Sequence, residues 1–149
     1  MSNSPVLEQR HAELDYKLLF EHMPGMCLVL DPSFNIVAQN AEHAHISLSL
    51  GKAVIGKHVF EVFPENPRDR NTRGVSALRE SLIKVLKTRM PDVMPIIRYD
   101  VQPLGGDYQV RYWAVINTPI IGRDGFVQWI INRADDVTDM VERRLKEVH

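Results

Sequence analysis

The sequence predicts an α+β domain built on a five-stranded antiparallel sheet, with short helices and one longer helix on one face. Three features of the chain carry this prediction. Two strand-like segments follow an opening helix, a helical stretch fills the middle, and three further strand-like segments precede a final helix. This order is typical of an antiparallel sheet that its helices cover on one side. Amphipathic helices are expected to flank the domain at both ends.

Length and composition exclude several classes of function. The chain has 149 residues, which fits one domain with short flanks. Its 18 basic and 19 acidic side chains create no overall field for nucleic acid or an anionic membrane. The longest apolar runs are strand-sized, so no membrane span is expected. Cys27 is the only cysteine, which excludes an internal disulfide and a cysteine-based zinc site and favours a cytoplasmic location.

Residues 6–23 are predicted to form the first amphipathic helix. Leu7, Leu14 and Leu18 recur at heptad-like spacing among charged residues, and Pro24-Gly25 ends the segment. At the other end, Asp136-Val137-Thr138 begins a final helix. Its apolar seam consists of Val137, Val141, Leu145 and Val148. A monomer would leave both seams exposed, so the sequence predicts a homodimer that uses Leu7, Leu14, Leu18, Val141 and Leu145.

The first two strands are expected at residues 26–30 and 35–39, where a turn-rich link joins them into a hairpin. Asn40 then caps a short helix that runs to about Leu48. After a compact apolar turn and a polar loop at 64–73, a clear helix begins near Gly74 and ends before Pro91. Its apolar face comprises Val75, Leu78, Leu82, Val85 and Leu86.

Three strands are predicted in the last third of the chain, at residues 94–101, 108–121 and 126–134. Two glycine-containing segments, 105–107 and 122–125, separate them. Glycine accepts the positive φ that tight hairpin turns require. The three strands are therefore expected to follow one another as antiparallel neighbours.

Several short motifs together resemble the PAS domain family. They are the lead-in Leu19-Phe20-Glu21-His22-Met23-Pro24-Gly25-Met26, the Asn40-Ala41 step, Ile55-Gly56-Lys57 with Phe60, the stretch from Tyr112-Trp113 to Pro119-Ile120, Asp124-Gly125, and Asp136-Val137-Thr138. The resemblance covers roughly residues 16–149 and is greatest to the input modules of bacterial sensor histidine kinases and related signalling proteins. It implies a PAS fold at 24–138, an N-terminal flanking helix at 1–23, and the start of a signalling helix at 139–149.

The resemblance also assigns a role to the end of the last strand. In such proteins the Asp-x-Thr motif, here Asp136 and Thr138, joins the sheet to a signalling helix. Either side chain could bond backbone groups at this junction and tie the helix to the strand. Simple capping of the final helix is the alternative interpretation.

Strand alternation places Trp113, Val115 and Asn117 on one face of the long strand. The resemblance to flavin-binding relatives implies that this face looks inward, together with Ile130, Asn132 and Ala134, and that a pocket lies between the sheet and the 74–90 helix. The pocket candidates are Trp113, Val115, Asn117, Ile130, Asn132, Tyr99, Ile97 and Leu82. Buried amides need partners, which for Asn117 and Asn132 could be a ligand, each other, a tyrosine hydroxyl or water.

No motif identifies a cofactor. Flavin photosensors of this family carry a reactive cysteine on the central helix, but residues 56–61 contain none and Cys27 belongs to the first strand, so a flavin–cysteine adduct is not expected. For haem, residues 74–90 contain no histidine. His58, with Met90 or Met94 as axial partner, is the remaining candidate. His43 and His45 are two residues apart and cannot chelate one metal together on a helix.

Two functions follow as hypotheses. One is a sensory module that detects a small ligand, cofactor or redox state in an apolar pocket and relays it through the flanking helices to an effector. The alternative is a ligand-free scaffold for dimerisation and protein interaction. No phosphate loop, phospho-accepting histidine motif or ATP-binding motif is present, so the chain is not expected to be an enzyme. Any kinase activity would belong to an effector in a longer parent chain.

Overall fold

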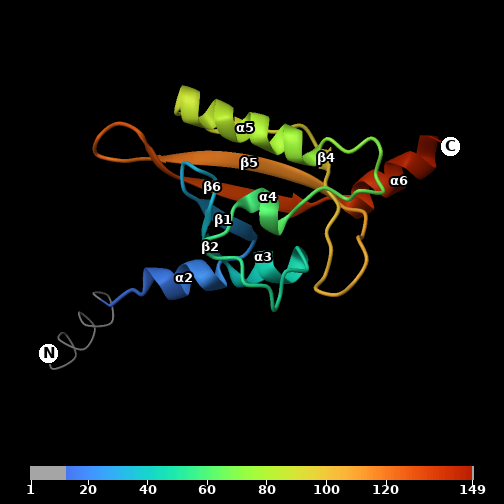
Figure 1. The fold of residues 1–149 in the computed structure, drawn as a ribbon, viewed down its shortest axis with the longest axis horizontal. Coiled ribbons are helices and arrows are strands. Elements are labelled where there is room, and N and C mark those ends of the chain that lie inside the picture. Colours follow the sequence, from blue (N-terminus) through green and yellow to red (C-terminus); the bar gives the residue numbers. More distant parts are fainter. Residues whose placement is uncertain (1–12, 149) are drawn as a thin grey trace, which may run out of the picture.

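An antiparallel sheet forms the centre of the structure, a computed structural model that describes residues 13–148 (Figure 1). The strand order across the sheet is β2-β1-β6-β5-β3, and β4 also pairs with β5. All pairings are antiparallel. The strands are β1 (Met26–Leu30), β2 (Ile36–Gln39), β3 (Asp92–Val93), β4 (Ile97–Arg98), β5 (Tyr112–Ile121) and β6 (Val127–Asp136). The first hairpin and the long final hairpin thus meet where β1 pairs with β6.

The edge strand beside β5 is interrupted. β3 pairs with the Asn117 end of β5 and β4 with the Trp113 end, so the two occupy one position at the sheet edge. The predicted antiparallel α+β architecture is therefore confirmed, with six strands in five positions, but the expected continuous strand at 94–101 is wrong. Met94 still donates its N–H to the Val115 carbonyl at 2.9 Å. The next residue, Pro95, has a restricted backbone and no N–H, and pairing with β5 resumes only at Ile97.

The long hairpin of β5 and β6 differs from the prediction mainly at its ends. The strand expected at 108–121 begins only at Tyr112, since the Arg111 N–H donates to the Asp100 carboxylate at 3.3 Å instead of to a neighbouring strand. β6 runs two residues further than expected, to Asp136. The predicted turn is present: Gly125 adopts φ +83° and donates its N–H to the Gly122 carbonyl at 3.0 Å.

Three helices cover the inner face of the sheet: α3 (Ala41–Ile46), α4 (Val59–Val62) and α5 (Gly74–Thr88). Asn40 caps α3 as predicted, accepting from the His43 N–H at 3.0 Å. α5 lies along β5 (Figure 1) and buries Leu78, Leu82 and Val85, three members of its predicted apolar face. The helix ends at Thr88 because Arg89 adopts a left-handed conformation, φ +56°, that breaks the helical ladder.

The N-terminal flank differs from the expected long helix. Among the described residues it is helical only in α2 (Tyr16–His22), because the Asp15 carboxylate accepts from the Leu18 N–H at 3.0 Å and starts the helix there. Leu14 therefore precedes the helix, which corrects its placement in a helical seam. Leu18 lies within the helix and is half exposed. Leu7 lies outside the described residues.

The C-terminal flank is the predicted final helix, α6 (Thr138–Val148). It leaves the sheet at the end where β5 begins and β6 stops (Figure 1). Of its seam, Val141 is half-buried, whereas Leu145 and Val148 are exposed. Within residues 13–148, no helix has both the length and the apolarity to cross a membrane.

Candidate functional site

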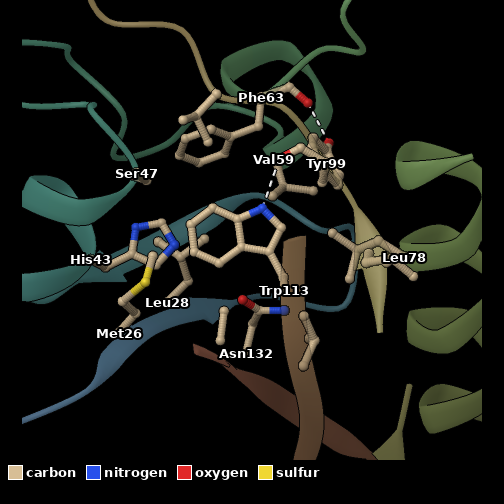
Figure 2. A pocket seen from close by; sticks show the side chains of 14 residues that line it. Met26, Leu28, His43, Ser47, Val59, Phe63, Leu78, Tyr99, Trp113 and Asn132 are labelled. Carbon is tan, nitrogen blue, oxygen red and sulfur yellow. Dashed lines mark hydrogen bonds between the residues drawn. The ribbon is translucent and has the colours of Figure 1, made fainter. Parts of the chain in front are cut away.

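An apolar cavity of about 70 Å³ lies between the inner face of the sheet and the helices. Strands β1, β4, β5 and β6 contribute its sheet side, and α3, α4 and α5 contribute its helical side (Figure 2). Its 14 lining residues are Met26, Leu28, His43, Ser47, Val59, Phe63, Leu78, Ile97, Tyr99, Val101, Trp113, Val115, Asn132 and Ala134. The cavity is thus formed by segments from almost the whole domain.

The structure brings together five of the eight predicted pocket residues. Trp113, Val115, Asn132, Tyr99 and Ile97 line the cavity. Asn117, Ile130 and Leu82 do not, although each is completely buried. Ile130 lies towards the β5–β6 turn, opposite Pro119, and Leu82 lies one helical turn beyond the lining residue Leu78. The Asn117 amide is turned towards α5. These three residues therefore belong to the packed core beside the cavity.

Trp113 forms one wall of the cavity and is held by hydrogen bonds. Its indole N–H donates to the Tyr99 carbonyl at 2.7 Å, and the Tyr99 hydroxyl donates to the Phe63 carbonyl (Figure 2). Burial raises the pKa of the Tyr99 phenol, which therefore remains a donor at neutral pH. The indole is thus tied to the edge strand, and the edge strand to the end of α4.

Asn117 and Asn132 bond each other, which is one of the alternatives that the sequence left open. Asn132 Nδ2 donates to Asn117 Oδ1 at 2.7 Å, and Asn117 Nδ2 donates to Ser81 Oγ on α5 at 2.9 Å. The Ser81 hydroxyl donates to the Asp92 carboxylate at 2.7 Å, and Lys84 Nζ lies 3.2 Å from the other oxygen of that carboxylate. A chain of polar groups thus leads from the cavity to the sheet edge.

His43 is a cavity residue that the sequence did not identify. Its ring is 5 % exposed, packs edge-on against Phe63 at 5.7 Å, and has Nδ1 3.0 Å from Gln39 Nε2. Burial lowers its pKa to about 4, so the ring is neutral at pH 7. The i,i+4 spacing of His43 and Ser47 could have indicated a shared buried face, since both line the cavity.

Stability is expected to fall as the pH drops from about 6.5 to about 4, because the unfolded chain then binds a proton that buried His43 does not. A shift of this size corresponds to a loss on the order of 3 kcal/mol. The exchange His43→Gln should remove this component, whereas His45→Gln, at an exposed position of the same helix, should retain it. Urea unfolding between pH 4 and 7 measures both. Equal pH dependence in the two variants would contradict the prediction.

The cavity does not suit the cofactors considered from the sequence. At about 70 Å³ it is far smaller than the ~300–1,000 Å³ of pockets for drug-sized ligands, so it would have to expand to hold haem or flavin. His58 does not line it; this histidine caps α4, with Nδ1 accepting from the Phe60 N–H at 3.2 Å. Met90 is exposed, and Met94 contacts Asn117 Nδ2 through its sulfur. Cys27 is buried outside the cavity lining.

The junction between the sheet and α6 contains both predicted polar residues. The Tyr112 N–H donates to Thr138 Oγ1 at 3.0 Å, and the Val137 N–H donates to the Tyr112 carbonyl at 2.9 Å. Asp136 Oδ1 accepts from the Thr138 N–H at 3.0 Å and from the Thr138 hydroxyl. Asp136 therefore caps the final helix, as the alternative interpretation of the motif expected. Thr138 ties the start of α6 to the start of β5.

The family of the chain follows from a comparison with protein-family models. A model described as PAS fold matches residues 20–142, which is most of the chain. The chain therefore belongs to the PAS-fold family. PAS domains related to it are sensory modules in signalling proteins. A comparison with curated proteins found no match.

Solved structures show the same fold at low sequence identity. A sensory box sensor histidine kinase from Vibrio cholerae is 18 % identical, with a TM-score of 0.53 over 93 % of this chain and 98 % of that one. A PAS domain from Colwellia psychrerythraea is 17 % identical, with a TM-score of 0.61 over 90 % and 98 %. An RNA-binding light-oxygen-voltage receptor is 16 % identical, with a TM-score of 0.63. The present chain is covered to 99 % by that receptor but spans only 37 % of its length.

Proposed function

We propose that this chain is a sensory module that takes a small ligand into the cavity beside Trp113 and relays occupancy through α6. One observation carries the proposal: the cavity and the helix junction are adjacent along the chain. Trp113 lines the cavity, and the next residue towards the N-terminus, Tyr112, holds α6 through its N–H and its carbonyl. A displacement of the indole therefore acts directly on the backbone to which α6 is attached.

The relay requires two arrangements of α6 with different affinities for the ligand. A ligand that bound both equally would shift nothing, however tightly it bound. The short tie between Tyr112 and Thr138 supports such a difference, because a small rotation of the β5 end breaks or keeps a single 3.0 Å hydrogen bond. Thr138 is the one fully buried residue of α6, so few other contacts oppose movement of the helix.

The proposal extends to partners and location. We place the module in the cytoplasm, as a homodimer joined to an effector such as a histidine kinase in a longer parent chain, without catalytic activity of its own. The half-exposed Leu18 and Leu145 support a dimer that uses the flanking helices. The fold shared with the Vibrio cholerae sensor histidine kinase supports an effector of that class.

Ligand sensing can be tested on the chain itself. A non-denaturing mass spectrum of the purified protein would reveal a retained ligand, and a panel of small uncharged metabolites can be screened by thermal shift. The expected result is a bound species, or a compound that raises the Tm and slows amide exchange in residues 139–148. Compounds that raise the Tm without changing exchange in α6 would contradict the relay.

The exchange Thr138→Val is expected to uncouple α6 from the cavity. Valine keeps the shape of threonine but cannot accept from the Tyr112 N–H, at a cost of about 1–2 kcal/mol in the free energy of unfolding. The most stabilising panel compound should still raise the Tm of this variant but should no longer protect α6 from amide exchange. Thr118→Val, in the same strand but remote from the junction, is the control and should behave like the wild type. Protection of α6 in both variants would contradict the proposed relay.

One observation favours the scaffold alternative. The cavity is small, and the amide nitrogen of its lining residue Asn132 already donates to the buried Asn117 instead of being free for a ligand. If the chain is a ligand-free scaffold, no compound will raise its Tm. In that case Thr138→Val will alter stability alone.

A further inference from the structure

The polar chain behind the cavity has a fixed donor direction. It ends at Asp92, whose pKa is held below its usual range first by the bond from Ser81, so the group is a carboxylate and can only accept. The Ser81 hydroxyl must therefore donate to Asp92, at 2.7 Å, and its oxygen accepts from Asn117 Nδ2 at 2.9 Å. Asn117 then presents its carbonyl oxygen to Asn132. Each link determines the orientation of the next.

The last link determines what the cavity offers to a ligand. Because Asn117 presents an oxygen, Asn132 must use Nδ2 to donate to it, at 2.7 Å. The Asn132 carbonyl oxygen is thereby turned towards the cavity. Figure 2 shows this oxygen on the side of His43 and the amide nitrogen turned away from it. Asn132 is only 7 % exposed, and no side-chain bond within residues 13–148 reaches its oxygen.

Three of the other polar side chains of the cavity wall are already engaged within the protein, while His43 is bonded only through Nδ1, which lies 3.0 Å from Gln39 Nε2. The Trp113 N–H bonds the Tyr99 carbonyl, the Tyr99 hydroxyl bonds the Phe63 carbonyl, and Ser47 Oγ lies 2.8 Å from Ser49 Oγ. None of the lining residues is a lysine, arginine, aspartate or glutamate. A charged ligand would lose its hydration without gaining a counter-charge, which makes its burial costly.

We infer that the cavity selects a small uncharged molecule with an N–H or O–H group, which donates a hydrogen bond to Asn132 Oδ1. This inference rests on the proposed ligand-sensing function and narrows its ligand class. The volume of about 70 Å³ is below that of a ~150 Å³ apolar cavity that holds benzene, so the ligand is smaller than benzene or the walls yield slightly. Short alcohols, amides and five-membered azoles belong to this class.

Pyrrole and furan provide a test on the unmodified protein. The two rings have nearly the same size and shape, but only pyrrole carries a donor. NMR titration, following the Trp113 indole and the Asn132 amide, should show pyrrole binding at least about ten-fold more tightly than furan. Equal binding would overturn the selection of donors while leaving the sensing function intact. Binding of neither ring would contradict both.

A variant outside the cavity tests the fixed direction separately. Asp92→Asn replaces the terminal acceptor with an amide that can also donate to Ser81, so the orientation of Asn132 is no longer imposed. The ratio of pyrrole to furan affinity should fall towards one. Lys84→Met is the matched control, because it removes the neighbour of the carboxylate at 3.2 Å but leaves the acceptor in place. An unchanged ratio in Asp92→Asn would overturn the imposed orientation.

Discussion

Replacing Asn40 with alanine is expected to lower the free energy of unfolding by about 3–5 kcal/mol. The side chain is completely buried and takes part in four hydrogen bonds. Its oxygen accepts from the Cys27 and His43 N–H groups at 3.0 Å each, and its nitrogen donates to the Met23 and Gly25 carbonyls at 3.3 and 2.7 Å. One amide thus joins the end of α2, the start of β1 and the start of α3.

Chemical unfolding followed by circular dichroism measures this loss. Asn35→Ala is the matched control, since the Asn35 amide makes a single 3.2 Å bond to Asp31 in a half-buried turn. Its expected cost is about 1 kcal/mol or less. Similar losses in the two variants would show that Asn40 has no special role at this junction.

The second large effect is expected for Trp113→Ala, with a loss of about 3–5 kcal/mol. The indole is only 5 % exposed, so its removal enlarges the cavity and leaves the Tyr99 carbonyl without its donor. Trp113→Phe retains most of the apolar contact and should cost less, about 1–3 kcal/mol, mainly for the unpaired carbonyl. Guanidinium unfolding of the two variants separates the packing contribution from the hydrogen bond.

Trp129→Ala is the control for this comparison. Trp129 belongs to the same hairpin, where it pairs with Ile120, but it is 38 % exposed. Its loss should therefore cost clearly less than that of Trp113. Equal destabilisation at the two positions would contradict the view that Trp113 is a wall of the core. Because Trp113 is also part of the core, any effect of Trp113→Ala on ligand binding must be separated from its effect on folding.

Much of the fold could be predicted because local patterns and tertiary structure agree. The apolar run of β1, the cap residue Asn40 and the turn at Gly122–Gly125 each specify one conformation, and the structure has them in place. The errors arose where a single residue overrides a longer pattern. Asp15 starts α2 within the leucine repeat, and Pro95 divides the edge strand. The periodic spacing of apolar residues alone does not reveal such interruptions.

The candidate site was harder to predict because it depends on register. The irregularity between Ile120 and Ile121 shifts the pairing of β5 and β6 by one residue. Ile121 pairs with Val127 next to the hairpin turn. If the strands kept this register along their whole length, Asn117 would lie opposite Ile131 rather than Asn132. The hydrogen bond between the Asn117 and Asn132 side chains therefore depends on a bulge that cannot be predicted from the residue pattern. His43 was missed because its only signal in the sequence is the i,i+4 spacing with Ser47, on a helix of just six residues.

The division of the edge strand at Pro95 has a consequence for solubility. An uninterrupted edge strand offers a row of free N–H and C=O groups on which the strand of another molecule can add. Here β3 and β4 contain two residues each, and between them stands a residue that has no N–H to offer. An incoming strand would find no continuous set of donors along this side of the sheet. This edge of the sheet is therefore a poor template for the addition of a strand from another molecule.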